Sequence, residues 1–171
     1  MKQRNHRAKS AAHVNLRMER WHRRSLYAAV IALTASGMLW LTGHYFLRSP
    51  GEFGPTIHPI EPWSMRLHGA AALTMMFFVG SVLNSHIRRA WRAASNLTAG
   101  CSLIAVITLL TVTGYCLWYV ASETSRETWS TIHWVLGLAF PILLAWHIIL
   151  GRRSRRQRAE QWPAPDAAGV L

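Results

Sequence analysis

The sequence predicts an all-α integral membrane protein, built as a bundle of four transmembrane helices. Half of its 171 residues (51%) are hydrophobic, although the formal net charge is +12. The charged residues lie between four long apolar runs that contain no Asp, Glu, Lys or Arg: residues 26–47, 67–87, 99–122 and 129–151. A bilayer core needs about 20 apolar residues per helix. Because lipid offers no hydrogen-bond partner to a backbone amide, each run is expected to cross the membrane as a helix.

The chain divides into three parts by charge. Residues 1–24 form a basic tail, residues 25–151 hold the four runs, and residues 152–171 form a second basic tail that we expect to be disordered. The segment 48–65 contains four prolines and is expected to be a loop outside the cytoplasm, because proline and glycine favour turns. No internal repeat is evident, so the sequence indicates one transmembrane domain with two tails.

The Lys and Arg residues are distributed unequally between the two sides of the predicted bundle. Sixteen of the 19 lie in the two tails and in the loop between the second and third runs, and three lie in the other two loops. The positive-inside rule therefore places both termini in the cytoplasm, which predicts a bacterial inner-membrane protein. We expect the basic tails to contact anionic membrane lipid. Because topology already accounts for their charge, no nucleic-acid partner is expected.

Histidine is the residue type that points to chemistry. Ionisable side chains are rare at membrane depth and are functional candidates by default. Six of the nine histidines lie within or at the ends of the runs: His22, His44, His68, His86, His133 and His147. An ordinary interfacial position is the alternative explanation for those nearest a helix end, such as His22 and His86.

The spacing of four of these histidines predicts two pairs. His133 and His147 are 14 residues apart on the fourth helix, which separates them by about 40° around the axis and about 21 Å along it. His68 and His86 are 18 residues apart on the second helix, hence on one face and about 27 Å apart. The two helices run in the same direction. His68 and His133 therefore share an outer level, and His86 approaches His147 at an inner level.

Two facing neutral imidazoles are the ligands of a six-coordinate haem iron, and helix bundles build cofactor sites from inward-facing side chains. The sequence has no C-x-x-C-H segment for covalent attachment, so one or two haem b groups are expected. The expected iron ligands are His68, His133, His86 and His147. The two axial separations differ by about 6 Å, so two rivals stay open: His22 at the inner level and His44 at the outer level.

The pattern resembles the four-helix di-haem cytochrome b group, which includes the membrane subunits of formate dehydrogenases and nickel–iron hydrogenases. In that group the fourth helix carries two histidines spaced like His133 and His147, and a histidine at the start of the second helix, like His68, completes the outer haem. The resemblance implies an inner ligand from the first helix, hence His22 rather than His86. Residues 58–63 and 68–72 also resemble an uncharacterised branch of small bacterial four-helix membrane proteins.

These features predict a di-haem membrane cytochrome that passes electrons between a redox partner protein and a quinone or second carrier. No flavin or nicotinamide fingerprint is present, which indicates an electron-transfer subunit rather than a self-contained enzyme. One alternative is a non-haem anchor or assembly subunit whose histidines form helix–helix hydrogen bonds. Another is a transition-metal conduit lined by His44, His58, His68 and His133.

Overall fold

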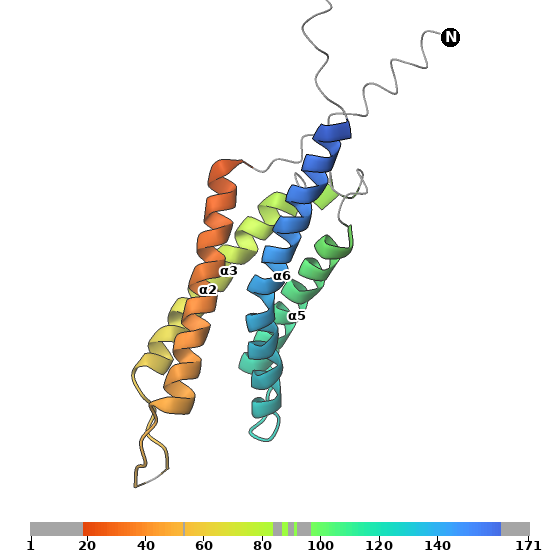
Figure 1. The fold of residues 1–171 in the computed structure, drawn as a ribbon. Helices are drawn as coiled ribbons and strands as arrows, with labels where there is room; N and C mark the ends of the chain where they lie inside the picture. The colour runs from red at the N-terminus through yellow and green to blue at the C-terminus, as the bar shows by residue number, and fades with distance from the viewer. Residues whose placement is uncertain (1–18, 53, 84–86, 89–90, 92–96, 162–171) are drawn as a thin grey trace, which may run out of the picture.

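The computed structural model describes residues 19–52, 54–83, 87–88, 91 and 97–161. This part of the chain forms four long helices: α2 (Arg20–Phe46), α3 (Ile60–Val82), α5 (Leu97–Tyr119) and α6 (Arg126–Gln161) (Figure 1). Each is long and apolar enough to cross a membrane, α6 over Arg126–Ser154. The prediction of an all-α fold with four membrane-spanning helices is confirmed.

Three helices extend well beyond the apolar runs that predicted them. α2 begins at Arg20, inside the segment expected to be a tail. α3 begins at Ile60, inside the segment expected to be a loop, because Pro62 lies in the first turn, where a missing amide donor costs nothing. α6 continues to Gln161, since residues 152–161 are mainly good helix formers and include neither Gly nor Pro. The expected disorder is therefore wrong for residues 152–161. The remaining tail residues, 1–18 and 162–171, lie outside the described part.

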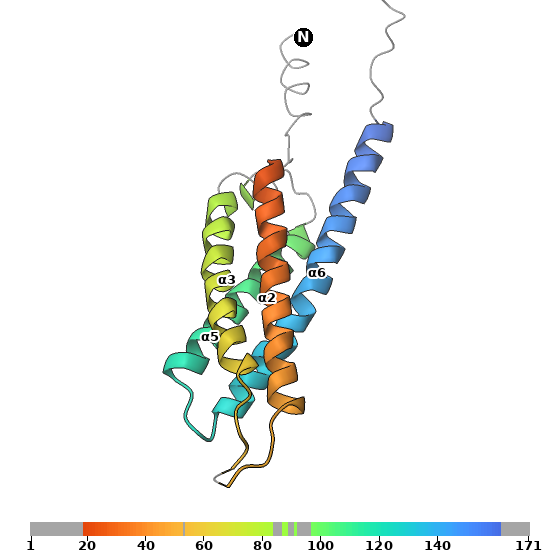
Figure 2. The ribbon, with the colours of Figure 1, turned by 90° about the vertical axis from the view of Figure 1, so that its left-hand side faces the viewer.

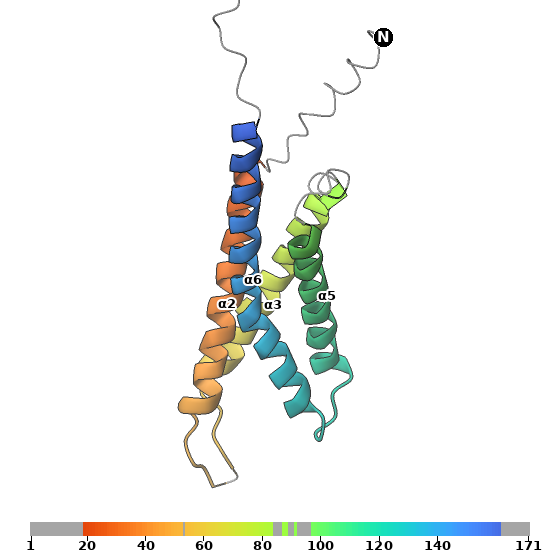
Figure 3. The ribbon, with the colours of Figure 1, turned by 45° about the vertical axis from the view of Figure 1, so that its right-hand side comes forward.

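The helices pack as two antiparallel hairpins, α2 with α3 and α5 with α6, and α2 also contacts α6. Figures 1 and 3 show the two hairpins side by side, with both short connections at one end of the bundle. α2 begins and α6 ends at the opposite end, where α6 extends beyond its neighbours (Figure 2). This arrangement places the two chain ends that the structure describes on one side of a membrane.

The interior is small, and most large apolar side chains face outward. Its buried centre comprises Ala29, Val30, Met75, Leu103 and Phe140. By contrast, the outward-facing Phe77 and Trp118 are 72% and 75% exposed. Lipid tails are as apolar as these side chains, so association of the helices depends on close packing and on hydrogen bonds between them.

The closest approach of α2 to α3 requires a glycine at position 43. A Cβ atom on Gly43 would lie 2.6 Å from Ile60 Cγ2 and 2.9 Å from Glu61 Cγ. Small residues allow helix backbones to approach closely in membranes. Gly43 therefore fixes how the start of α3 lies against the end of α2.

We expect Gly43→Val to destabilise the protein by about 1–3 kcal/mol more than Gly80→Val, because only the first substitution overfills a packed contact. Nothing lies within 4 Å of the corresponding Cβ position at Gly80, and both variants place the same β-branched residue in α2 or α3. Reversible unfolding in detergent, followed by circular dichroism, measures the difference. If Gly43→Val and Gly80→Val lost the same free energy of unfolding, the close approach of α2 to α3 at Gly43 would be contradicted.

Candidate functional site

The structure brings together His68 of α3 and His133 of α6. Their ring centroids lie 6.2 Å apart, and the ring planes are inclined by 72°. The two histidines belong to different hairpins, so this pair, which we call the outer pair, bridges the halves of the bundle. Their predicted role as iron ligands requires that both rings present an unprotonated nitrogen.

A hydroxyl on α2 fixes the protonation of the His68 ring. Ser36 Oγ lies 2.9 Å from His68 Nδ1, and Ser36 is completely buried. The same hydroxyl donates its hydrogen to the carbonyl oxygen of Ala32 at 2.6 Å. Because a hydroxyl carries one hydrogen, His68 Nδ1–H must be the donor to Ser36 Oγ. In its neutral form, the His68 ring that makes this bond has its lone pair on Nε2.

The second hairpin repeats this arrangement with threonine. Thr113 Oγ1 of α5 lies 2.8 Å from His133 Nδ1 and donates to the carbonyl oxygen of Leu109 at 2.8 Å. His133 Nδ1 therefore carries the hydrogen, and its Nε2 keeps the lone pair. Histidines that bind a metal usually donate their other ring N–H in this way. In their neutral forms, both rings of the outer pair thus present Nε2 as the nitrogen with a lone pair, which is the tautomer that metal ligation requires.

A glycine follows each of these hydroxyl residues and lies against the histidine ring. A Cβ on Gly37 would lie 3.6 Å from His68 Cε1, and one on Gly114 would lie 3.4 Å from His133 Cε1. Both glycines end the pattern T-x-[S/T]-G, at residues 34–37 and 111–114. This short motif is the signal by which the sequence could have identified the hydroxyl partners.

A buried donor lies next to His133 in the sequence. The indole Nε1 of Trp134 is shielded from solvent and has no hydrogen-bond partner in the described part of the chain. Buried donors in proteins are almost always paired, because an unpaired one costs free energy. The Trp134 N–H is therefore a donor that could bind an acceptor other than the described protein atoms.

His44 and His58 do not join the outer pair. His44 stacks on Trp40, with ring centroids 4.5 Å apart, and His58 Nδ1 accepts a hydrogen bond from the backbone N–H of Ile60 at 3.3 Å. Among the described residues, no three His, Cys, Asp or Glu side chains are grouped to hold a metal ion. The structure therefore does not group the four histidines of the metal-conduit alternative, which stays a prediction.

The inner histidines lie against other helices. His147 of α6 lies close to Gly100 of α5, where a Cβ would be 3.9 Å from His147 Cε1. His22 Nε2 lies 2.9 Å from the hydroxyl of Ser81 on α3, and its ring lies 3.8 Å from that of Trp21. His86 lies outside the described residues. The inner pairing, His147 with His22 or His86, therefore stays a prediction.

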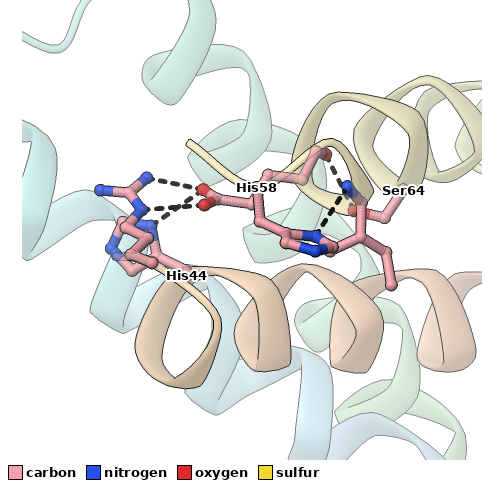
Figure 4. A network of polar contacts seen from close by, with 6 residues as sticks. His44, His58 and Ser64 are labelled. Carbon is pink, nitrogen blue, oxygen red and sulfur yellow. Dashed lines mark hydrogen bonds and ion pairs between the residues drawn. The ribbon is translucent and has the colours of Figure 1, made fainter. Parts of the chain in front are cut away.

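A polar network lies at the end of the α2–α3 hairpin where the two helices are connected. Sequence reasoning missed it by placing Glu61 in a loop. The Glu61 side chain is only 5% exposed. It accepts hydrogen bonds from Arg48 Nε at 2.8 Å and Arg48 Nη2 at 2.6 Å, and His44 Nδ1 lies 3.3 Å from its Oε2 atom. Figure 4 shows these contacts beside His58 and Ser64. Hydrogen bonding to Glu61 raises the pKa of Arg48, which stays charged.

The chain matches no protein-family model, no curated protein and no solved structure. The resemblance to di-haem cytochromes b therefore rests on the histidine pattern alone.

We expect Ser36→Ala to lower the free energy of unfolding by about 1–3 kcal/mol, because it leaves the His68 Nδ1–H buried without its acceptor. Thr74→Ala is the matched control, since that hydroxyl donates to the carbonyl oxygen of Ala70 within its own helix, and its removal should cost less than about 0.5 kcal/mol. Chemical unfolding of the two variants in the same detergent compares them. A control that loses as much stability as Ser36→Ala would contradict the hydrogen-bond assignment.

Proposed function

We propose that this protein is a b-type membrane cytochrome that passes electrons across the bilayer, between a redox partner protein and a quinone or second carrier. The single observation that carries the proposal is the outer pair, two neutral imidazoles from separate hairpins with both Nδ1–H groups already engaged. Haem, when bound, supplies the one-electron chemistry, and the chain supplies ligands, orientation and an apolar surrounding.

The spacing of the outer pair suits one iron between two rings. Metal–imidazole bonds are about 2.0–2.1 Å and a ring nitrogen lies about 1.1 Å from its ring centre, so two imidazoles on opposite sides of a metal have centres about 6.3 Å apart. The observed separation is 6.2 Å. The lack of side chains at Gly37 and Gly114 leaves space beside the rings, and the Trp134 N–H offers a donor to an acceptor group of the cofactor.

The chain's own residues would then hold the ligands in a fixed state. Ser36 and Thr113 accept the Nδ1–H of His68 and His133, which orients both rings and keeps each Nε2 directed away from the hydroxyl. Both hydroxyl residues are buried, at 0% and 4% exposure. Hydrogen bonds to the outer ring nitrogen also make imidazole a stronger ligand. We assign Ser36 and Thr113 as positioning residues.

A second haem at the inner level would use His147, completed by His22 or His86. His147 follows His133 by 14 residues on α6, which is about 21 Å along the axis. One iron cannot serve both, so two haems would form a path across most of the bilayer. The proposed site of action is the bacterial inner membrane, with both basic ends in the cytoplasm near anionic lipid.

The non-haem alternative is a membrane anchor or assembly subunit, and three contacts favour it. His68, His133 and His22 each form a hydrogen bond to a hydroxyl on a neighbouring helix, with Ser36, Thr113 and Ser81. In bilayers such bonds contribute on average about 0.6 kcal/mol each. These bonds would hold the helices together without any cofactor. A haem protein is red and an anchor is colourless, so the colour of the purified protein distinguishes the two functions.

We expect purified protein from haem-replete cells to be red, with the reduced spectrum of a low-spin bis-histidine haem that acid acetone extracts. His68→Ala and His133→Ala should each remove the same haem, about half of a two-haem total, whereas His58→Ala should retain all of it. Haem per chain, measured by extraction, gives the result. Colourless wild-type protein would favour the anchor.

His147→Ala should remove the other haem, because its side chain is about 21 Å from His133 along α6. His22→Ala and His86→Ala then decide the inner ligand, since only one of them should reproduce the loss seen with His147→Ala. If neither does, or if the wild type holds one haem, the two-site proposal is wrong and the outer site stands alone.

The proposed topology predicts that a reporter active only outside the cytoplasm is silent when fused after Leu171 and active when fused near Gly54. The sixteen-to-three distribution of Lys and Arg is the reason. A reporter active only in the cytoplasm, fused at the same two sites, is the control and should give the opposite pattern. Activity of the first reporter after Leu171 would contradict the orientation.

A further inference from the structure

Two largely apolar grooves on the surface of the bundle meet at Arg66 of α3. The first groove has a volume of about 520 Å³, and its walls include Trp40 of α2, Gly69 of α3 and Trp118 of α5. The second groove has a volume of about 470 Å³ and is lined by residues of α3 and by Leu39 of α2. Among the described residues, Arg66 alone lines both grooves. Both volumes are in the range of sites that bind small molecules.

Arg66 places a positive charge where the two grooves meet. Its side chain is exposed, and its guanidinium carbon lies 4.7 Å from the centroid of the Trp63 ring, a cation–π contact. In the described part of the chain, Arg66 forms no ion pair with Asp or Glu. The other ionisable residue that lines a groove is Glu61, whose charge Arg48 neutralises through two hydrogen bonds. The charge of Arg66 is therefore left for a ligand.

The polar and apolar parts of the grooves are ordered along α3 as they are in a lipid molecule. Arg66 directly precedes the apolar run of residues 67–87, so it lies at the level of the lipid headgroups. The exposed Trp63 and Trp118 mark the same level, where tryptophan is enriched in membrane proteins. Gly69 lies about 4.5 Å further along the helix, and no atom lies within 4 Å of its Cβ position. The first groove is therefore open beneath the charge.

We propose that α3 carries a binding site for one glycerophospholipid, whose phosphate binds Arg66 and whose two acyl chains occupy the two grooves. A guanidinium binds phosphate through strong, often paired, charge-assisted hydrogen bonds. Two grooves that meet at one cation match a molecule with one phosphate and two chains, whereas a free phosphate ion would use neither groove. The site involves no cofactor, so it does not depend on the proposed electron transfer.

The test is photolabelling of the full chain, freed of lipid in an uncharged detergent. The probe is a phosphatidylglycerol that carries a photoreactive diazirine on each acyl chain, and the comparison probe is a diacylglycerol with the same chains and no phosphate. Mass spectrometry of the labelled peptides measures attachment at the segments that line the grooves. One arginine near a phosphate strengthens binding on the order of fivefold. Below saturation, the phosphatidylglycerol should therefore label these segments about five times as strongly as the diacylglycerol.

Two matched pairs of variants separate the charge from the grooves. Arg66→Gln should lower phosphatidylglycerol labelling about fivefold, to the level of the diacylglycerol. Arg24→Gln, which removes an exposed arginine at the other end of the bundle, should leave labelling at the grooves unchanged. Gly69→Leu should lower labelling by both probes, because the new side chain fills the first groove. Gly80→Leu should not, although its Cβ position on α3 is equally open.

Equal labelling of the grooves by the two probes would overturn the site, and so would labelling that Arg66→Gln does not change. A loss with Arg24→Gln as large as that with Arg66→Gln would show general attraction to anionic lipid instead. Displacement of the probe by excess inorganic phosphate would identify a site for the free ion. Cross-linked dimers without lipid attachment at the grooves would show that a second copy covers them. Each of these results contradicts the proposal, and circular dichroism checks that every variant has formed its helices.

Discussion

The constraint on which this structure depends is that a polar group within a bilayer must find its partner inside the protein. His68 and His133 meet it through Ser36 and Thr113, which are themselves bonded to backbone carbonyl oxygens one turn earlier. Each imidazole is thus tied to the neighbouring helix of its own hairpin. One ring nitrogen is consumed by this bond, and the other keeps its lone pair for a ligand. The same contact therefore pairs a buried polar group and orients the ring that we propose as a ligand.

The same constraint explains why the apolar residues lie outside. In water, large apolar side chains such as Phe77 and Trp118 would be stabilised by burial. In lipid they gain nothing by burial, so glycines and hydroxyls form the contacts between helices. Gly43 lets the start of α3 approach α2, and Gly37 and Gly114 leave the histidine rings uncovered.

Charge at the outer end is handled in a different way. Glu61 is almost fully buried and would be costly without a partner, yet Arg48 neutralises it through two hydrogen bonds and His44 provides a third contact. Removing Arg48 would leave the buried carboxylate of Glu61 without a compensating charge. The network also closes the α2–α3 connection onto the helices, in addition to the bridge between Ser49 and Thr56.

The number of helices, their approximate positions and the level shared by His68 and His133 could all be predicted from the sequence. Length and hydropathy determine a membrane span, and the helical period determines depth and face. The start of α3 and the end of α6 do not follow from hydropathy, because helix propensity and capping decide where a helix begins and stops. The partners Ser36, Thr113 and Arg48 lie on segments distant in sequence, so only the packing of α2 on α3 and of α5 on α6 brings each to its histidine or carboxylate.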